Sequence, residues 1–380
     1  MERHLYFDYC ATTPIHPEVR SAMLKTLDQD FGNPSSMHSF GKSAAQAIAD
    51  ARAEVAAGLC CSPDEITFTS GATESDNLAL LGVMRQQPPG KTHLITTSIE
   101  HHAVLHTAKQ LQSEGYQITV LSVDDQGLVD PADVRKALRP DTALISVMLV
   151  NNEVGSIQPV AEIGKIAHEN GILFHSDAVQ AIGLLDVNVQ TQNIDLLSLS
   201  AHKIYGPKGV GALFVRKGVS LAPLSFGGSQ ENSLRPGTEN VPGIAGLGAA
   251  MRLTNQHKAV ERERLSRLRS SLISGLLERI PGLTVNGPAA QAAHVLSLSF
   301  PDANGEMMLI RLNGAGIAVS MGSACTSKDI EPSHVLTAMR MPLSQIDGTL
   351  RISLGYPTTE AELLTLLEIL PEIWRKAKNN

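Results

Sequence analysis

The chain has 380 residues, of which 43% are hydrophobic and 18% charged; this is typical of a globular protein and too long for one ordinary domain. Its formal net charge is -7 and no dense stripe of Lys and Arg is present, which argues against direct nucleic-acid binding. The longest apolar runs are far too short to cross a bilayer and the N-terminus lacks a signal-peptide layout, so we expect a cytoplasmic protein without a membrane segment.

The first two thirds of the chain alternate between apolar strands and helical patterns. We expect strands at 66–69, 93–97, 118–121, 143–150, 172–175, 196–199 and 212–215. Helices are expected at 74–85, 102–114, 131–138 and 160–169. Apolar strands joined by helical crossovers predict a mostly parallel seven-stranded sheet, covered on both faces, in a large α/β domain over residues 15–255.

The remaining residues predict a smaller domain. A long helical stretch runs from 241 to 279. After it we expect strands at 295–300, 317–320 and 350–354, and helices at 306–312, 333–340 and 360–374. This pattern predicts a C-terminal α+β domain formed by residues 256–380, with residues 1–14 packed against it.

One lysine lies in a small, hydroxylated run, Ser200-Ala201-His202-Lys203, directly after an expected strand. A lysine amine that is kept dry and unprotonated can attack a carbonyl carbon and form a Schiff base. Ser200 and His202 are suited to donate hydrogen bonds to a phosphate, so the run indicates pyridoxal 5'-phosphate (PLP), which needs both a lysine and a phosphate anchor. A surface lysine before a Gly-Pro turn is the alternative, and this segment alone does not decide.

Other polar groups also follow expected strands, where ligands of open α/β sheets bind. Gly71 permits a tight turn, and the amides of Ala72 and Thr73 would open a helix N-terminus that suits a phosphate; a plain Ser/Thr cap is the alternative. Asp177 could pair with a protonated pyridine nitrogen, or only cap the next helix. Asn152 and Gln180 follow strands as well and could hydrogen-bond the 3-oxygen of the ring.

Two more features remain open from the residues alone. His101 and His102 follow the strand at 93–97, where an imidazole could stack on a pyridine ring and move protons, but the sequence leaves open which of them would act. Arg351 lies in an apolar strand and needs a carboxylate partner. That partner is either a carboxylate of the protein, in a structural ion pair, or the α-carboxylate of a substrate.

The four cysteines are Cys10, Cys60, Cys61 and Cys325, which form neither a secreted disulfide framework nor a zinc-site spacing, so we expect no metal. Cys60 and Cys61 end a helical run and are interpreted as small core residues. Cys325 lies in a polar, Gly- and Ser-rich segment near Lys328, which indicates an accessible thiol with thiolate character. An incidental exposed cysteine is the alternative.

At this point the chain resembles the cysteine desulfurases of iron–sulfur cluster and thio-cofactor assembly, in the aminotransferase class V branch of fold-type I PLP enzymes. The resemblance covers nearly the whole chain. It rests on segments 9–14 (YCATTP), 31–38 (FGNPSSMH), 69–75 (TSGATES), 150–153 (VNNE), 177–180 (DAVQ), 200–203 (SAHK), 235–240 (RPGTEN) and 322–327 (GSACTS). It implies the fold-type I architecture, with a large PLP-binding domain and a small domain that carries a catalytic cysteine loop at about 321–333, as in the longer-loop group of the family.

The resemblance also implies residue roles. Lys203 would hold PLP, Asp177 would face the pyridine nitrogen, and His101 would stack on the ring as a catalytic proton carrier. The ring oxygen and the phosphate would be bound by Ala72, Thr73, Asn152, Gln180, Ser200 and His202. Thr238 would reach the phosphate of the neighbouring subunit, which implies a homodimer.

The implied reaction converts L-cysteine to L-alanine. Arg351 would clamp the substrate carboxylate with Asn152 beside it, and Cys325 would accept the sulfur as a persulfide. The acceptor protein is not identified: a cluster scaffold, a tRNA-thiolation enzyme and a thiamine-pathway protein all fit. A class V aminotransferase, a selenocysteine lyase and a non-catalytic protein of the same fold are the alternatives.

Two departures from the family pattern stand out. Cys10 replaces an expected alanine. The sequence ends soon after its last expected helix, so we expect it to lack the extended tail that some relatives use to grip a scaffold.

Overall fold

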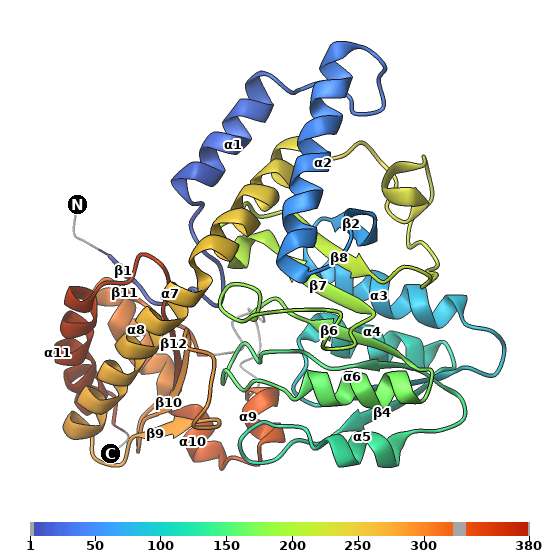
Figure 1. The fold of residues 1–380 in the computed structure, drawn as a ribbon. Coiled ribbons are helices and arrows are strands. Elements are labelled where there is room, and N and C mark those ends of the chain that lie inside the picture. The colour runs from blue at the N-terminus through green and yellow to red at the C-terminus, as the bar shows by residue number, and fades with distance from the viewer. Residues whose placement is uncertain (1–3, 322–331, 379–380) are drawn as a thin grey trace.

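The computed structural model describes residues 4–321 and 332–378. Its central element is a seven-stranded sheet of order β2-β8-β7-β6-β5-β3-β4 (Figure 1). The strands are β2 (Ile66–Thr69), β3 (His93–Thr97), β4 (Gln117–Leu121), β5 (Thr142–Ser146), β6 (Leu173–Asp177), β7 (Leu196–Ser200) and β8 (Gly211–Val215). Only β8 runs antiparallel to its neighbours β2 and β7. The predicted mostly parallel sheet is confirmed.

Strand β5 is shorter than the sequence predicts. It ends at Ser146, whereas the apolar run suggested a strand to Val150. The N–H of Leu149 still donates to the Asp177 carbonyl at 2.8 Å, but the N–H of Met148, on the other edge, donates to the Glu100 carboxyl at 2.9 Å. A side chain thus replaces the neighbouring strand as the partner, and the ladder ends there.

Successive side chains of each strand point to opposite faces of the sheet and contribute to two apolar cores, one on each face. Leu94, Leu144 and Leu196 pack under α3 (Ala72–Gln86) and α4 (His102–Ser113). Their chain neighbours Ile95, Ile145 and Leu197 belong to the opposite core, with α2 (Ser39–Leu59), α5 (Pro131–Ala137), α6 (Val160–Glu169) and the first part of α7 (Val241–Arg279). Both faces of the sheet are therefore buried, as its apolar strands require.

Helix α7 links these layers to the rest of the molecule. Its first turns pack on α2 and on α1 (Pro17–Asp28) at very close range, since a Cβ on Gly248 would lie 2.5 Å from the Cα of Ala51. Further along, Leu265, Leu268 and Leu272 enter a third core. One continuous helix thus contributes to two cores.

The third core lies under a smaller antiparallel sheet of order β12-β10-β9, formed by β9 (Thr284–Asn286), β10 (Val295–Ser299) and β12 (Thr349–Ser353). In the described part of the chain, the helices after α7 are α8 (Gly305–Gly314), α9 (His334–Ala338), α10 (Leu343–Asp347) and α11 (Glu360–Lys376). The N-terminal strand β1 (Leu5–Tyr6) pairs in parallel with β11 (Ile317–Ala318). The domain division at residue 255 stays a prediction, and that position falls inside α7.

Cys60 caps the C-terminus of α2 in a left-handed conformation with φ 59°. Cys60 is exposed and Cys61 is half-buried. The interpretation of both as core residues is therefore wrong for Cys60, because the turn that ends the helix carries its side chain outward. Across the described ranges, no helix combines the length and apolar character needed to span a bilayer.

Candidate active site

The carboxyl ends of the parallel strands open on a cavity of about 650 Å³. Its lining includes most of the candidate residues: Ala72, Thr73, His101, Asn152, Asp177, Gln180, Ser200, His202, Lys203 and Arg351. Thr238 lies outside this cavity, exposed on the segment before α7. Cys325 lies outside the described residues.

Lys203 follows β7 at the end of the short helix η2 (Ala201–Lys203). Its Nζ donates hydrogen bonds to the carbonyls of Cys10 at 2.5 Å and Ala11 at 2.8 Å. Burial lowers the pKa of Lys203, and the nearby Arg351 guanidinium acts in the same direction. The partial burial of the amine favours its neutral form, which is the form that acts as a nucleophile.

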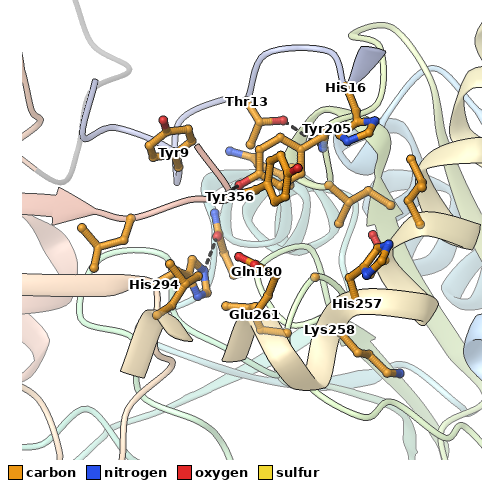
Figure 2. A pocket seen from close by; sticks show the side chains of 18 of the residues that line it. Tyr9, Thr13, His16, Gln180, Tyr205, His257, Lys258, Glu261, His294 and Tyr356 are labelled. Atoms are coloured by element: carbon orange, nitrogen blue, oxygen red, sulfur yellow. Dashed lines mark hydrogen bonds between the residues drawn. The ribbon is translucent and has the colours of Figure 1, made fainter. Parts of the chain in front are cut away.

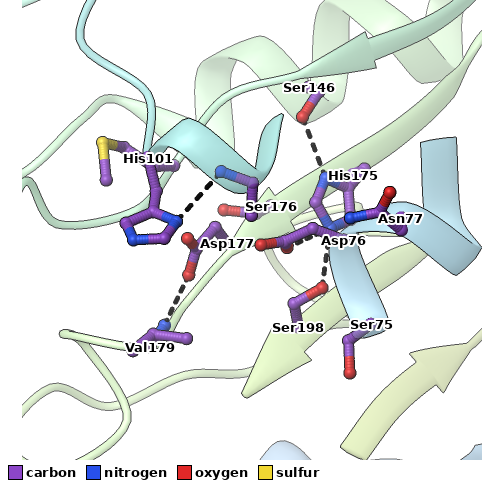
Figure 3. A network of polar contacts seen from close by, with 12 residues as sticks. Ser75, Asp76, Asn77, His101, Ser146, His175, Ser176, Asp177, Val179 and Ser198 are labelled. Carbon is purple, nitrogen blue, oxygen red and sulfur yellow. Dashed lines mark hydrogen bonds and ion pairs between the residues drawn. The ribbon is translucent and has the colours of Figure 1, made fainter. Parts of the chain in front are cut away.

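Asp177 is the last residue of β6 and is buried. It accepts the N–H of Val179 at 2.9 Å (Figure 3). Burial raises the pKa of Asp177, whereas this hydrogen bond and the Lys203 cation lower it. A cation placed in the cavity beside this carboxyl would favour its charged form.

A buried polar network lies behind Asp177 (Figure 3). His175 contacts the hydroxyls of Ser146 at 2.9 Å and Ser198 at 3.0 Å, and its Nε2 is 3.6 Å from Asp76. Burial lowers the pKa of His175 to about 3, so the ring is neutral at pH 7. Burial and the Asp177 carboxylate raise the pKa of Asp76 well above its usual value. Of the two acids, Asp76 therefore takes up the proton more readily, and Asp177 keeps the charge.

The first turn of α3 forms one wall of the cavity. Gly71 caps this helix with φ 151°, a backbone conformation that a residue with a side chain rarely adopts. The hydroxyl of Ser200, the imidazole of His202 and the ammonium group of Lys208 line the same cavity. Burial, with the charges of Lys203 and Lys208, lowers the pKa of His202 to about 4. A helix N-terminus surrounded by such donors suits a phosphate.

His101, and not His102, lines this cavity. It caps α4, and its Nδ1 accepts the N–H of Ala103 at 3.1 Å. Burial lowers the pKa of His101 to about 4, with Lys203 and His102 adding to the effect, so the neutral ring carries its proton on Nε2. His102 instead packs between His106 and His334, with ring centroids 4.9 and 4.7 Å away and the rings tilted by 42° and 48°.

Arg351 combines the two arrangements that the sequence left open. It is buried in β12, and its Nη2 donates to Asp8 at 2.9 Å. Its Nη1 donates to the Asn152 carbonyl at 3.0 Å, and the residue also lines the cavity. An ion pair and a cavity-facing guanidinium thus coexist on one side chain.

Ser320 and Ser333, which lie near the two ends of the segment 322–331, both make contacts at the site. The backbone of Ser320 exchanges two hydrogen bonds with that of Arg351, at 3.1 and 2.6 Å. The Ser333 hydroxyl donates to Glu153 at 2.5 Å, directly after Asn152. Ser320 therefore contacts the cavity-lining Arg351, and Ser333 contacts the residue that follows the cavity-lining Asn152.

Some contributors were missed by the sequence analysis. Lys208 could have been found, since it lies in the Gly-Pro-Lys-Gly turn five residues after Lys203. The carbonyls of Cys10 and Ala11 that hold the lysine carry no sequence signal, because every residue has a carbonyl.

Lys203 and Gln180 also line a second, smaller cavity of about 100 Å³. Figure 2 shows this cavity with Gln180 in its wall. Its walls include the N-terminal arm (residues 4–14) with His16, the turn around Tyr205 and the middle of α7, together with residues 179–184 and His294. The residues from α7 are Leu253, Thr254, His257, Lys258, Glu261 and Leu265.

Comparisons with known proteins agree with this geometry. The profile of the aminotransferase class-V family matches residues 5–366. The chain is 50% identical over 376 residues to "Cysteine desulfurase IscS" of Methanosarcina thermophila, which covers 99% of this chain and 93% of the relative. Among solved structures, a "NIFS-like protein" is similar with a TM-score of 0.93 and 39% identity, covering 98% of this chain and all of that one.

A further solved structure, "SspA in complex with cysteine", has a TM-score of 0.83 and 39% identity, and covers 92% of this chain and 98% of its own. The fold and the site define a member of the aminotransferase class V group, whose fold positions a lysine at the carboxyl ends of a parallel sheet. With half of its residues shared over nearly the full length of a curated relative, the chain belongs to the cysteine desulfurases within that family.

Proposed function

We propose that the protein uses PLP to convert L-cysteine to L-alanine and passes the sulfur to Cys325 as a persulfide. The observation that carries this proposal is the cavity that gathers Lys203, Asp177 and the first turn of α3 in a chain half identical to a cysteine desulfurase. The similar SspA protein, whose structure is described as a complex with cysteine, supports the substrate class.

The residues present fit PLP. Lys203 would bond its aldehyde carbon, Asp177 would meet its ring nitrogen, and Gln180 and Asn152 would face its 3-oxygen. The phosphate would bind the amides of Ala72 and Thr73 with Ser200 and His202. When bound, PLP supplies a ring that accepts negative charge from the α-carbon of the substrate.

The chain's own residues would then position the substrate and move protons. Arg351 would bind the α-carboxylate of L-cysteine, with Asn152 beside it. The Nζ of Lys203 would take the α-proton as a general base, which its lowered pKa favours. His101 would donate a proton from Nε2, which carries the ring proton because Nδ1 accepts the N–H of Ala103.

The sulfur step balances without an external oxidant or reductant. The Cys325 thiolate attacks the substrate sulfur, and an S–S bond forms as the Cβ–S bond breaks. The electron pair of that bond stays on the carbon skeleton, where protons complete L-alanine. Ser320 and Ser333, on either side of the segment that carries Cys325, contact Arg351 and Glu153 at the site, which supports this assignment.

Two variants test these roles separately. We expect Lys203→Ala to lose the visible absorption of bound PLP and its labelling by borohydride, together with all alanine formation. Cys325→Ser should retain absorption and labelling but release no sulfide in the presence of a thiol. Sulfide release at the wild-type rate by Cys325→Ser would exclude the persulfide role, and alanine formation that requires an added keto acid would indicate an aminotransferase instead.

The assembly and the cellular context also belong to this proposal. We place Thr238 at the phosphate of a neighbouring subunit, which makes the active unit a homodimer. A sulfur-acceptor protein of iron–sulfur cluster assembly or of thiolation, located in the cytoplasm, would take the sulfur from Cys325.

A further inference from the structure

His294 contacts a residue of the main cavity from behind. It is buried directly before β10, and its Nε2 lies 3.1 Å from Oε1 of Gln180 (Figure 2). The other end of the Gln180 amide, Nε2, donates to the Cys10 carbonyl at 3.0 Å. His294 lines only the second cavity, whereas Gln180 lines both cavities. His294 therefore reaches a ligand of the main cavity only through Gln180.

The two contacts fix the direction of the Gln180 amide. A carbonyl can only accept, so the nitrogen of Gln180 must face Cys10 and its oxygen must face His294. The oxygen in turn requires that His294 donate from Nε2. The amide nitrogen has two hydrogens, and the Cys10 carbonyl takes one of them. The second hydrogen is left for an acceptor in the main cavity.

His294 is suited to act as a fixed donor. Burial lowers its pKa to about 4, and the charges of Arg351 and Lys203 add to this effect, so the ring is neutral at pH 7. The neutral ring carries one proton, and Gln180 Oε1 requires that proton on Nε2. Within the described part of the chain, Nδ1 is buried without a hydrogen-bond partner. The polar interaction of the ring with the protein is therefore directed at Gln180.

We propose that His294 is a positioning residue that locks the Gln180 amide with its N–H, and not its C=O, toward the 3-oxygen of bound PLP. The inference rests on the proposed function, since it takes Gln180 as the residue that meets this oxygen. Rotation of the amide by half a turn would place its oxygen against a negatively charged oxygen and also against the Cys10 carbonyl, which would lose the hydrogen bond from Gln180. The His294 donor opposes that rotation.

The test uses the holoenzyme and the visible absorption band of bound PLP. His294→Leu removes the donor and His294→Gln places an amide N–H near the same point. We expect His294→Leu to weaken PLP affinity about threefold to tenfold, the range expected for one hydrogen bond. The pH midpoint of the band should rise, because an N–H donor to the ring oxygen favours the form in which that oxygen is negative.

Two comparisons make this test specific. His294→Gln should restore both values most of the way to those of the wild type. His257→Leu, which replaces another histidine of the second cavity, should leave both unchanged. An unchanged band midpoint and affinity in His294→Leu would overturn the proposal.

A double-mutant cycle tests whether the effect passes through Gln180. In a Gln180→Leu background, His294→Leu should have no further effect on affinity or band midpoint, and an effect of full size there would also overturn the proposal. If the wild type binds no PLP, the proposed function fails by itself. In that case the His294–Gln180 contact is tested by the same double-mutant cycle, with the free energy of unfolding measured on the cofactor-free protein. A coupling energy of zero between the two substitutions would reject the contact.

Discussion

Glu100 is a buried acid directly before His101. It accepts hydrogen bonds from the Thr97 hydroxyl at 2.7 Å and from the N–H of Met148 at 2.9 Å. Burial nevertheless raises the pKa of Glu100 from 4.5 to about 8, so the folded protein holds a proton at pH 7 that the unfolded chain has released. The folded state therefore loses stability as the pH rises from 4.5 toward 8.

We expect Glu100→Gln to remove this dependence, because an amide keeps the hydrogen-bonding oxygen and has no proton to lose. Relative to the variant, the wild type should lose about 1 kcal/mol of unfolding free energy per pH unit over that interval. Urea titrations at several pH values measure the difference. Parallel pH curves for the two proteins would show that Glu100 is charged in the folded state.

At the scale of elements, the N-terminal arm and β12 meet through one buried ion pair. The side chains of Arg351 and Asp8 are 4% and 18% exposed, so the pair is only weakly screened by water. Asp8 partly neutralises the guanidinium that we assign to the substrate carboxylate. The arm therefore sets how strongly β12 attracts an anion.

Asp8→Asn tests this coupling between arm and strand. The variant should lose about 2 kcal/mol of unfolding free energy, since asparagine keeps a hydrogen bond but leaves a buried charge uncompensated. Its KM for L-cysteine should fall severalfold, because the uncompensated Arg351 attracts the carboxylate more strongly. A KM that rises along with the loss of stability would mean that Asp8 only positions Arg351.

The sequence predicted those parts of the site that depend on strand ends. Asp177 and Lys203 each follow an apolar strand of a parallel sheet, and such strands present their carboxyl ends on one edge. The contacts from Lys203 to Cys10 and from Gln180 to His294 join residues 193 and 114 positions apart. No local pattern specifies these contacts, because they depend on how the arm and β10 pack against the large sheet.

At the scale of the whole molecule, the proposed homodimer places Thr238 in the partner's site. Thr238→Ala should weaken PLP affinity several-fold, by the loss of about one hydrogen bond to the phosphate. A mixed dimer can be formed from one Thr238→Ala subunit and one Lys203→Ala subunit. The site of the Thr238→Ala subunit then retains Lys203 and receives an intact Thr238 from the other subunit. We expect that site to bind PLP with wild-type affinity in absorption titrations of the purified heterodimer. Weak binding there would place Thr238 in the site of its own chain.

Helix α7 is continuous over 39 residues, so the two sheets are connected by a rigid helix and not by a flexible hinge. A change in the angle between the smaller and the larger sheet would require α7 to bend. Its middle residues, His257 and Glu261 among them, form a wall of the small cavity. Any such bending would therefore change the shape of the small cavity that Lys203 and Gln180 also line.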